Sequence, residues 1–288
     1  MTQEFRGIVD LPSEIFLMIY QHLNQTDRIR LSVACKRMHE LCLDPGLWTE
    51  FIIDCMALHQ FSPQILSFAT RMCEVESVKV TNKYMVKVSE QSIAELLLKF
   101  QTSLIKLEFS DEVEVTTRFI DKLRKMDKLE SLELPGLSLT KTGYSSLSKL
   151  TRLQKLRIPS CTGSSEELIN LLGNWNNLKL LDISDMEKGA VNTKVLSAVT
   201  KNNPNLESLI IDESDRVNNG CCKAISENCP NLLELSMYGC DGVTESGIVN
   251  LVKKCQKLRL LSLGNLRMLS CRAIKCIAEL VDLEYLDV

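Results

Sequence analysis

The chain has 288 residues, of which 45% are hydrophobic and 25% charged, and its formal net charge is −3 at pH 7. This composition is ordinary for a folded soluble chain and excludes an intrinsically disordered one. No stretch approaches the roughly 18 uninterrupted apolar residues of a membrane span, and the opening MTQEFRGIVD has acidic residues where a signal peptide has basic ones. We therefore expect a cytoplasmic or nuclear protein, or both, without a membrane partner.

The charges are unevenly distributed. Residues 1–59 contain 5 Lys/Arg and 8 Asp/Glu, whereas residues 60–288 contain 29 of each. Nucleic-acid-binding domains carry a basic face, so no nucleic-acid partner is expected. The chain also has 12 cysteines. In a reducing compartment these are expected to be free thiols that act as small hydrophobic side chains.

The first predicted element is a helix over residues 11–23, LPSEIFLMIYQHL. Its Pro-Ser-Glu start suits the first helical turn, and nothing after Ile15 breaks a helix. Ile15, Ile19 and Leu23 share one face, but apolar side chains at the intervening positions cover the other faces. A helix that is apolar nearly all round must be buried from several directions. We therefore expect another protein to cover part of it.

Residues 11–51 resemble the F-box, a three-helix module of about this length. One departure concerns local packing only, since Met38 stands where an aromatic residue is frequent. The features that match the family pattern, in chain order, are Leu11-Pro12, Glu14-Ile15, Ile19, Leu23, Asp27-Arg28, VACK at 33–36 and DPGLW at 44–48.

The resemblance implies a partner. F-box modules bind a Skp-family adaptor, which joins them to a cullin scaffold that carries a RING protein and a ubiquitin-conjugating enzyme. Apolar residues left over after the helices pack would contact that adaptor. The residues so assigned are Leu11, Pro12, Ile15, Met18, Ile19 and Trp48. The residues assigned instead to the module's own core are Leu23, Leu31, Val33 and Leu41.

The predicted division of the chain places the F-box at residues 1–55 and the repeats described below at residues 75–288. Residues 56–74 are predicted to form a helical junction or a degenerate first repeat. FSPQILSFATRMC within this stretch has one proline and no Gly/Ser run, so the junction is expected to be stiff.

One phrase, L-x-x-L-x-apolar, recurs through the rest of the chain. Eight copies follow one another at steps of 24 to 28 residues, and a weaker copy begins at Val75. Helical patterns that open with Ser, Thr or Asn lie between them. One strand and one helix per unit is the leucine-rich-repeat pattern. The predicted fold class is therefore α/β: a short three-helix F-box, then a solenoid of about nine strands, with a curved parallel sheet inside and helices outside.

The last complete units resemble the cysteine-containing subclass of leucine-rich repeats. That resemblance puts Cys161 and Cys240 in the turn after a strand, and Cys229 and Cys255 at helix ends, all as small buried side chains. The alternative is a zinc site made by Cys221, Cys222, Cys229 and Cys240. No cysteine pairs recur at zinc-knuckle spacing and no histidine follows residue 59, so we expect no metal and no cofactor.

The repeat phrase also predicts a binding surface. Its leucines point into the core, and alternation along each strand sends the residues between them to the concave face. Charges along that face are mixed, and tyrosine is a frequent interface anchor. The candidate substrate-binding residues are Arg157, Asp182, Asp212, Tyr238 and Tyr285. The alternative is that they are solvated strand residues without a partner.

Signals for catalysis are weak. All three histidines lie within residues 1–59, and the 12 glycines are scattered, so neither a Cys–His or Ser–His pair nor a phosphate-binding loop is visible. We predict a non-catalytic substrate-recognition subunit of a cullin-RING ubiquitin ligase, whose F-box binds a Skp-family adaptor and whose repeats bind an unidentified protein substrate. The alternatives are a leucine-rich-repeat scaffold that acts outside ubiquitination and, disfavoured by the neutral repeats, an RNA-binding repeat protein.

Overall fold

The computed structural model describes residues 11–72, 74–267 and 269–288, with the backbone alone for residues 61–67. The opening MTQEFRGIVD, used above to argue against a signal peptide, lies outside these residues. The chain divides into two compact units, Met1–Leu107 and Glu108–Val288. Each unit is described by itself.

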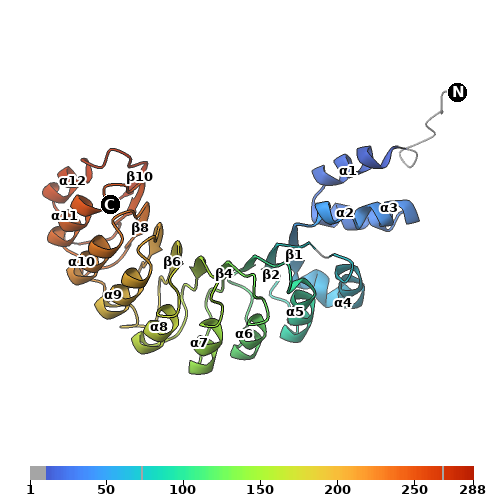
Figure 1. The fold of residues 1–288 in the computed structure, drawn as a ribbon, viewed down its shortest axis with the longest axis horizontal. Coiled ribbons are helices and arrows are strands. Elements are labelled where there is room, and N and C mark those ends of the chain that lie inside the picture. Colours follow the sequence, from blue (N-terminus) through green and yellow to red (C-terminus); the bar gives the residue numbers. More distant parts are fainter. Residues whose placement is uncertain (1–10, 73, 268) are drawn as a thin grey trace. The chain divides into compact units, whose positions relative to one another are not determined.

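Unit 1 begins with three short α-helices and one turn of 3-10 helix (Figure 1), which are α1 (Ser13–His22), α2 (Gln25–Ser32), α3 (Lys36–Cys42) and η2 (Pro45–Leu47). α1 starts directly after Pro12 and ends where the backbone of Leu23 becomes extended. Asn24 then caps α2, because its side-chain oxygen accepts a hydrogen bond of 2.9 Å from the N–H of Asp27. The predicted start of the first helix is confirmed, whereas the Asn24 cap of α2 was not predicted.

Buried side chains hold these helices together. Phe16 and Tyr20 of α1 are 1% and 0% exposed, and the Tyr20 hydroxyl donates a 3.0 Å hydrogen bond to the carbonyl of Met38. Arg28 ties α1 to η2, since its guanidinium donates to the carbonyls of Tyr20 and Leu47. Met38, the departure from the F-box pattern, is itself buried and belongs to this core.

The rest of unit 1 alternates strands and helices, which are β1 (Glu50–Asp54), α4 (Cys55–Ala69), β2 (Ser77–Thr81), α5 (Glu90–Leu97), the 3-10 helix η3 (Leu98–Phe100) and β3 (Lys106–Phe109), where the division into units falls. β1 pairs in parallel with β2, with Phe51 opposite Val78. This strand was not predicted, so the described residues form ten strands where the repeat phrase indicated about nine. β1 lies inside the stretch assigned to the F-box alone. The predicted domain limits and the stiffness of the junction stay predictions.

Unit 2 is a regular series of parallel strands and helices. Its helices are α6 (Thr117–Leu123), α7 (Lys141–Leu147), α8 (Ser165–Leu172), α9 (Thr193–Asn202), α10 (Asn219–Asn228), α11 (Glu245–Lys254) and α12 (Cys271–Ile277). Its strands are β4 (Ser131–Glu133), β5 (Lys155–Arg157), β6 (Leu180–Asp182), β7 (Ser208–Ile210), β8 (Glu234–Ser236), β9 (Leu260–Ser262) and β10 (Tyr285–Asp287). Within the unit, each strand pairs in parallel with the next, and the strands line the concave side of an arc whose outer side carries the helices (Figure 1). The predicted fold class is confirmed.

The core of unit 2 is a stack of leucines in register. Leu156 lies opposite Leu181 on the next strand, and the same position is leucine in the repeats that follow. Full burial of each such side chain contributes about 1.5–3 kcal/mol, so the stack provides most of the driving force that one repeat lacks alone. The leucines of this position, all at most 1% exposed, are Leu132, Leu156, Leu181, Leu209, Leu235 and Leu261.

A left-handed residue follows each of the strands β5 to β8. Ser160, Asp185 and Glu213 have φ values of 56°, 50° and 53°, and Gly239 takes the same place with φ 67°. Their N–H groups donate to carbonyls of the next repeat, as from Glu213 to Tyr238 at 2.8 Å. The backbone ladder therefore continues past the strand ends, and the residue just before each left-handed position stays on the concave face.

The predicted cysteine positions are confirmed. Cys161 and Cys240 lie in turns after strands, Cys229 and Cys255 cap α10 and α11, and all four are at most 1% exposed. The thiols of Cys161, Cys229 and Cys240 donate to carbonyls of preceding repeats at 3.3 to 3.4 Å, which satisfies backbone groups inside the stack. Burial raises the pKa of Cys240 to about 12, so this thiol stays protonated at neutral pH. Among the described residues, no group of three or more His, Cys, Asp or Glu side chains is placed to hold a metal ion. No described helix is both long enough and apolar enough to cross a membrane.

Candidate protein-interaction surfaces

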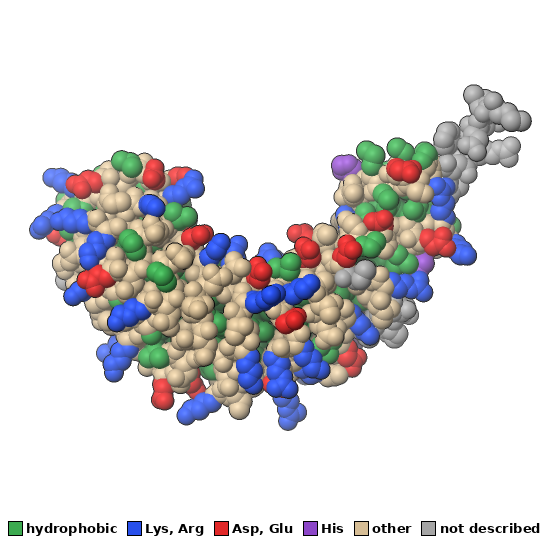
Figure 2. Space-filling model, in the orientation of Figure 1, with side chains coloured by type: hydrophobic (Ala, Val, Ile, Leu, Met, Phe, Trp, Pro, Cys, Tyr) green, Lys and Arg blue, Asp and Glu red, His purple; other side chains and the backbone are tan. Residues whose placement is uncertain are grey.

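The outer face of α1 carries uncovered apolar side chains. Ile15 and Met18 are 41% and 58% exposed, Pro12 is exposed, and Leu11 and Ile19 are half-buried. The opposite face of α1 holds the buried Phe16 and Tyr20, so the described residues pack against one side of the helix only. Figure 2 shows hydrophobic side chains gathered over α1 in unit 1. An apolar face of this kind fits a protein partner, and its contact with an adaptor stays a prediction.

Trp48 is placed differently from the expectation. It is 1% exposed, and its indole N–H donates to the carbonyl of Cys42. Its ring packs edge-on against Phe68 at 5.3 Å between centroids, and the guanidinium of Arg28 lies 5.8 Å from the ring centroid. The turn of η2 directs this side chain inward, so its assignment to the contact surface is corrected: Trp48 belongs to the core.

Val33 shows the opposite difference. It was assigned to the core of the helical module but is 81% exposed, because it directly follows α2 and points away from the packed helices. The other three residues with this assignment are half-buried; they are Leu23, Leu31 and Leu41. Val33 therefore adds exposed apolar surface to unit 1 that the sequence did not predict.

An apolar groove of about 1010 Å³ lies beside Val33 in unit 1. α2, β1 and α4 all contribute to its walls, and Ile52 of β1 is 48% exposed at its edge. Gln25 bridges α2 and β1, since its amide donates to the carbonyl of Ile52 and accepts from the N–H of Ile52, both at 2.6 Å. These two bonds satisfy the outer edge of β1 much as a neighbouring strand would. The groove was missed because β1 was not predicted, although the alternation of EFIID is a signal for it.

Two of the five concave candidates neutralise each other. Arg157 donates a 3.0 Å hydrogen bond to the carboxylate of Asp182, whose side chain is 10% exposed. The other oxygen of Asp182 accepts from the hydroxyl of Ser184 at 2.7 Å. This half-buried pair stabilises the junction of β5 and β6, and its charges are already matched.

The other three candidates lie closer to the carboxyl end of unit 2. Asp212 accepts hydrogen bonds from the Ser236 hydroxyl at 2.6 Å and from the Tyr238 N–H at 2.8 Å. Tyr238 and Tyr285 are 40% and 55% exposed. The structure thus places Asp212 beside Tyr238 on the concave side, with both tyrosines open to a partner.

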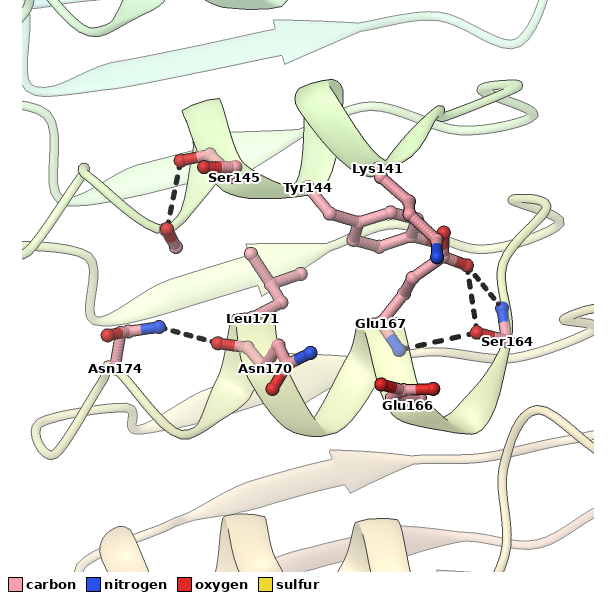
Figure 3. A pocket seen from close by; sticks show the side chains of 10 residues that line it. Lys141, Tyr144, Ser145, Ser164, Glu166, Glu167, Asn170, Leu171 and Asn174 are labelled. Atoms are coloured by element: carbon pink, nitrogen blue, oxygen red, sulfur yellow. Dashed lines mark hydrogen bonds between the residues drawn. The ribbon is translucent and has the colours of Figure 1, made fainter.

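A smaller hollow of about 430 Å³ lies between α7 and α8 (Figure 3). Its polar groups serve the start of α8: the Ser164 hydroxyl accepts from the Glu167 N–H at 3.3 Å, and the Ser164 N–H donates to the Glu167 carboxylate at 2.9 Å. The bonds from Ser164 lower the pKa of Glu167, and Lys141 lowers it further. This is a capping box, and its groups are used to begin a helix.

A family model identifies the helical part of unit 1. The F-box-like family matches residues 8–54, the region of α1, α2, α3, η2 and β1. The chain carries an F-box-like domain. The exposed face of α1 and the buried Trp48 both belong to this domain.

One solved structure supports the rest of the fold. Rad7 in the crystal structure of the yeast Rad7 and Elc1 complex matches with a TM-score of 0.65 and 22% identity, over 83% of this chain and 62% of that chain. This chain therefore spans less than two thirds of the length of Rad7. Two internalins of Listeria monocytogenes, inlF and inlC2, match with TM-scores of 0.40 and 0.42 and identities of 15% and 18%. The matches cover 77% of this chain and 50% of inlF, and 69% of this chain and 74% of inlC2. The Rad7 match supports the fold, an F-box-like domain followed by a leucine-rich-repeat solenoid.

Proposed function

We propose that this protein is the substrate-recognition subunit of a cullin-RING ubiquitin ligase. The F-box-like domain binds a Skp-family adaptor, and the repeats bind the protein to be ubiquitinated. The observation that carries the proposal is the F-box-like match at residues 8–54 together with the open face of α1, where Ile15 and Met18 are uncovered. Rad7, which shares the fold, was crystallised in complex with Elc1.

The proposed role requires no catalytic residue in this chain. Holding a target and a ubiquitin-charged enzyme in one assembly raises their local concentration, which turns a slow bimolecular encounter into a fast one. In this proposal the protein works in the cytosol or the nucleus, and its specificity comes from the concave face of the repeats.

Affinity capture from cells with degradation blocked tests the proposal. The tagged full-length chain is expected to recover a Skp-family adaptor and a cullin, and a variant with Leu11 and Pro12 changed to alanine to recover neither. Val33→Asp serves as a second variant, because Val33 is exposed on a different part of the same domain. Recovery of the adaptor by that variant would confine the contact to the α1 face.

The alternative function is a leucine-rich-repeat scaffold outside ubiquitination. The open concave face with Tyr238 and Tyr285 would serve that function too, since binding a protein there requires no adaptor. The same capture experiment separates the two: a stable partner of the repeats recovered without any cullin would favour the scaffold.

A further inference from the structure

The concave face of β7 to β10 differs in charge from the rest of unit 2. In the register of these strands, Glu234 shares a column with Tyr285, and Asp287 shares the next column with Ser236. Asp212 and Tyr238 continue the face just beyond the ends of β7 and β8. Strands β7 to β10 and positions 212, 238 and 264 beyond their ends contain no Lys or Arg, and Arg259, just before β9, pairs with Glu284. We call Asp212, Glu234, Asp287, Tyr238 and Tyr285 the acidic face.

A serine of an adjacent repeat fixes each of the three carboxylates. The donor hydroxyls are Ser236 for Asp212 at 2.6 Å, Ser208 for Glu234 at 2.5 Å and Ser262 for Asp287 at 2.8 Å. Among the residues that the structure describes, none of the three carboxylates forms an ion pair, in contrast to Asp182, which Arg157 neutralises. The negative charges are therefore held in position and left without a matching positive charge.

Asp212 shows the electrostatic consequence. Burial raises the pKa of this carboxyl, the carboxylates of Asp182 and Asp287 raise it further, and the hydrogen bonds from Ser236 and the Tyr238 N–H oppose these effects. A positive charge placed beside Asp212 would relieve the repulsion among the carboxylates. The face is thus complementary to a cation supplied by a partner.

The Tyr238 ring and the Asp287 carboxylate both lie over Gly264, which leaves room for them. A Cβ atom at Gly264 would come within 2.7 Å of the Tyr238 ring and 2.8 Å of the Asp287 carboxylate. An exposed ring next to a carboxylate suits a lysine or arginine side chain, whose stem packs on the ring while its charge meets the carboxylate. A neutral polar segment could pack on the ring but would bring no charge to the carboxylate.

We propose that the acidic face binds a basic, extended segment of the target protein. This inference rests on the proposed function, in which the repeats hold the target. Asp212 and Asp287 stand three strands apart, roughly 14 Å at the usual strand spacing. Because an extended chain advances about 3.3–3.6 Å per residue, the segment carries two Lys or Arg residues about four positions apart.

An array of synthetic peptides of about twelve residues, with Lys or Glu at systematically varied positions, tests the proposal on the purified full-length chain. Peptides with two lysines about four residues apart are expected to bind about five- to tenfold more tightly than their glutamate counterparts. This difference in affinity should shrink at high salt, which screens the charges. The variant Asp212→Asn/Asp287→Asn is expected to lose this preference. It retains an oxygen for the Ser236 and Ser262 hydroxyls, so the fold is kept.

Glu227→Gln is the matched control, because Glu227 lies on helix α10 on the outer side, where it pairs with Lys254. This variant is expected to keep the preference for lysine. Equal binding of lysine and glutamate peptides, or a preference that survives in the double variant, would overturn the proposal. So would self-association of the chain that the double variant abolishes, since a second copy would then occupy the face.

Capture of the Skp-family adaptor by the same preparations separates this inference from the proposed function. The double variant is expected to capture the adaptor normally, because unit 1 is unchanged. Failure of the wild-type chain to bind the adaptor would contradict the proposed function only. A wild-type chain that captures the adaptor but shows no preference for lysine peptides would contradict this inference only.

Discussion

Replacing both Ile15 and Met18 with alanine is expected to weaken adaptor binding strongly. Their exposed fractions are 41% and 58%, and full burial of one such side chain contributes about 1.5–3 kcal/mol. Covering only the exposed parts then contributes about 1.5–3 kcal/mol for the two residues together. The double variant should therefore bind the adaptor about 10- to 150-fold more weakly than the wild type.

Calorimetric titration of the purified chain with the adaptor measures this loss, and thermal unfolding serves as the control. Exposed positions contribute little to stability, so the free energy of unfolding should change by less than about 1 kcal/mol. Phe16→Ala, on the buried side of the same helix, should instead destabilise the F-box-like domain by about 3–5 kcal/mol. An unchanged Kd for the Ile15/Met18 double variant would refute the assignment of the α1 face to the adaptor.

Three further predictions concern other parts of the chain. Gln25→Leu removes both side-chain hydrogen bonds to the edge of β1, so hydrogen exchange at that edge should accelerate and the unfolding free energy should fall by about 1–3 kcal/mol; unchanged exchange there would contradict the bridge. Gly242→Ala should lower the Tm by several degrees, because a Cβ there would collide with the Val217 carbonyl; an unchanged Tm would contradict that close approach. Iodoacetamide at mildly alkaline pH should label the exposed Cys271 before the buried Cys240, because the raised pKa of Cys240 keeps its thiol protonated; the reverse order, followed by mass spectrometry of the native protein, would contradict this.

Most of the fold could be predicted from the repeat phrase. A leucine stack in register requires one strand per copy, so the strands from β2 onward follow from spacing alone. β1 could not be found in this way, because Phe51 and Ile53 are its buried residues and no leucine phrase marks it. Once β1 was missed, the groove beside it was missed as well.

The direction of single side chains was harder to predict. Val33 and Trp48 both follow directly after short helical elements, where the last turn decides which way a side chain points. Their exposures of 81% and 1% reverse the expected roles, since only tertiary packing selects between the two directions. The family pattern includes Trp48, but it does not show whether this side chain is buried or exposed.

On the concave face, alternation placed Asp212 and Tyr238 on the correct side of the sheet. It could not show which hydroxyl meets which carboxylate, because Ser236 and Asp212 are 24 residues apart and Ser208 and Glu234 are 26 apart. Those contacts depend on the register of adjacent repeats. The distinction between the neutralised Asp182 and the unmatched Asp212 therefore required the structure.

The central claim is that one chain brings a target to the ubiquitination machinery. Reconstituted ubiquitin transfer tests it most directly, with the adaptor, cullin, RING protein, ubiquitin-conjugating enzyme and a protein captured by the repeats. Ubiquitin conjugates of that protein should form only when this chain is present, and the Ile15/Met18 variant should abolish them while leaving target binding intact. Conjugates formed equally without the chain, or equally with that variant, would contradict the claim.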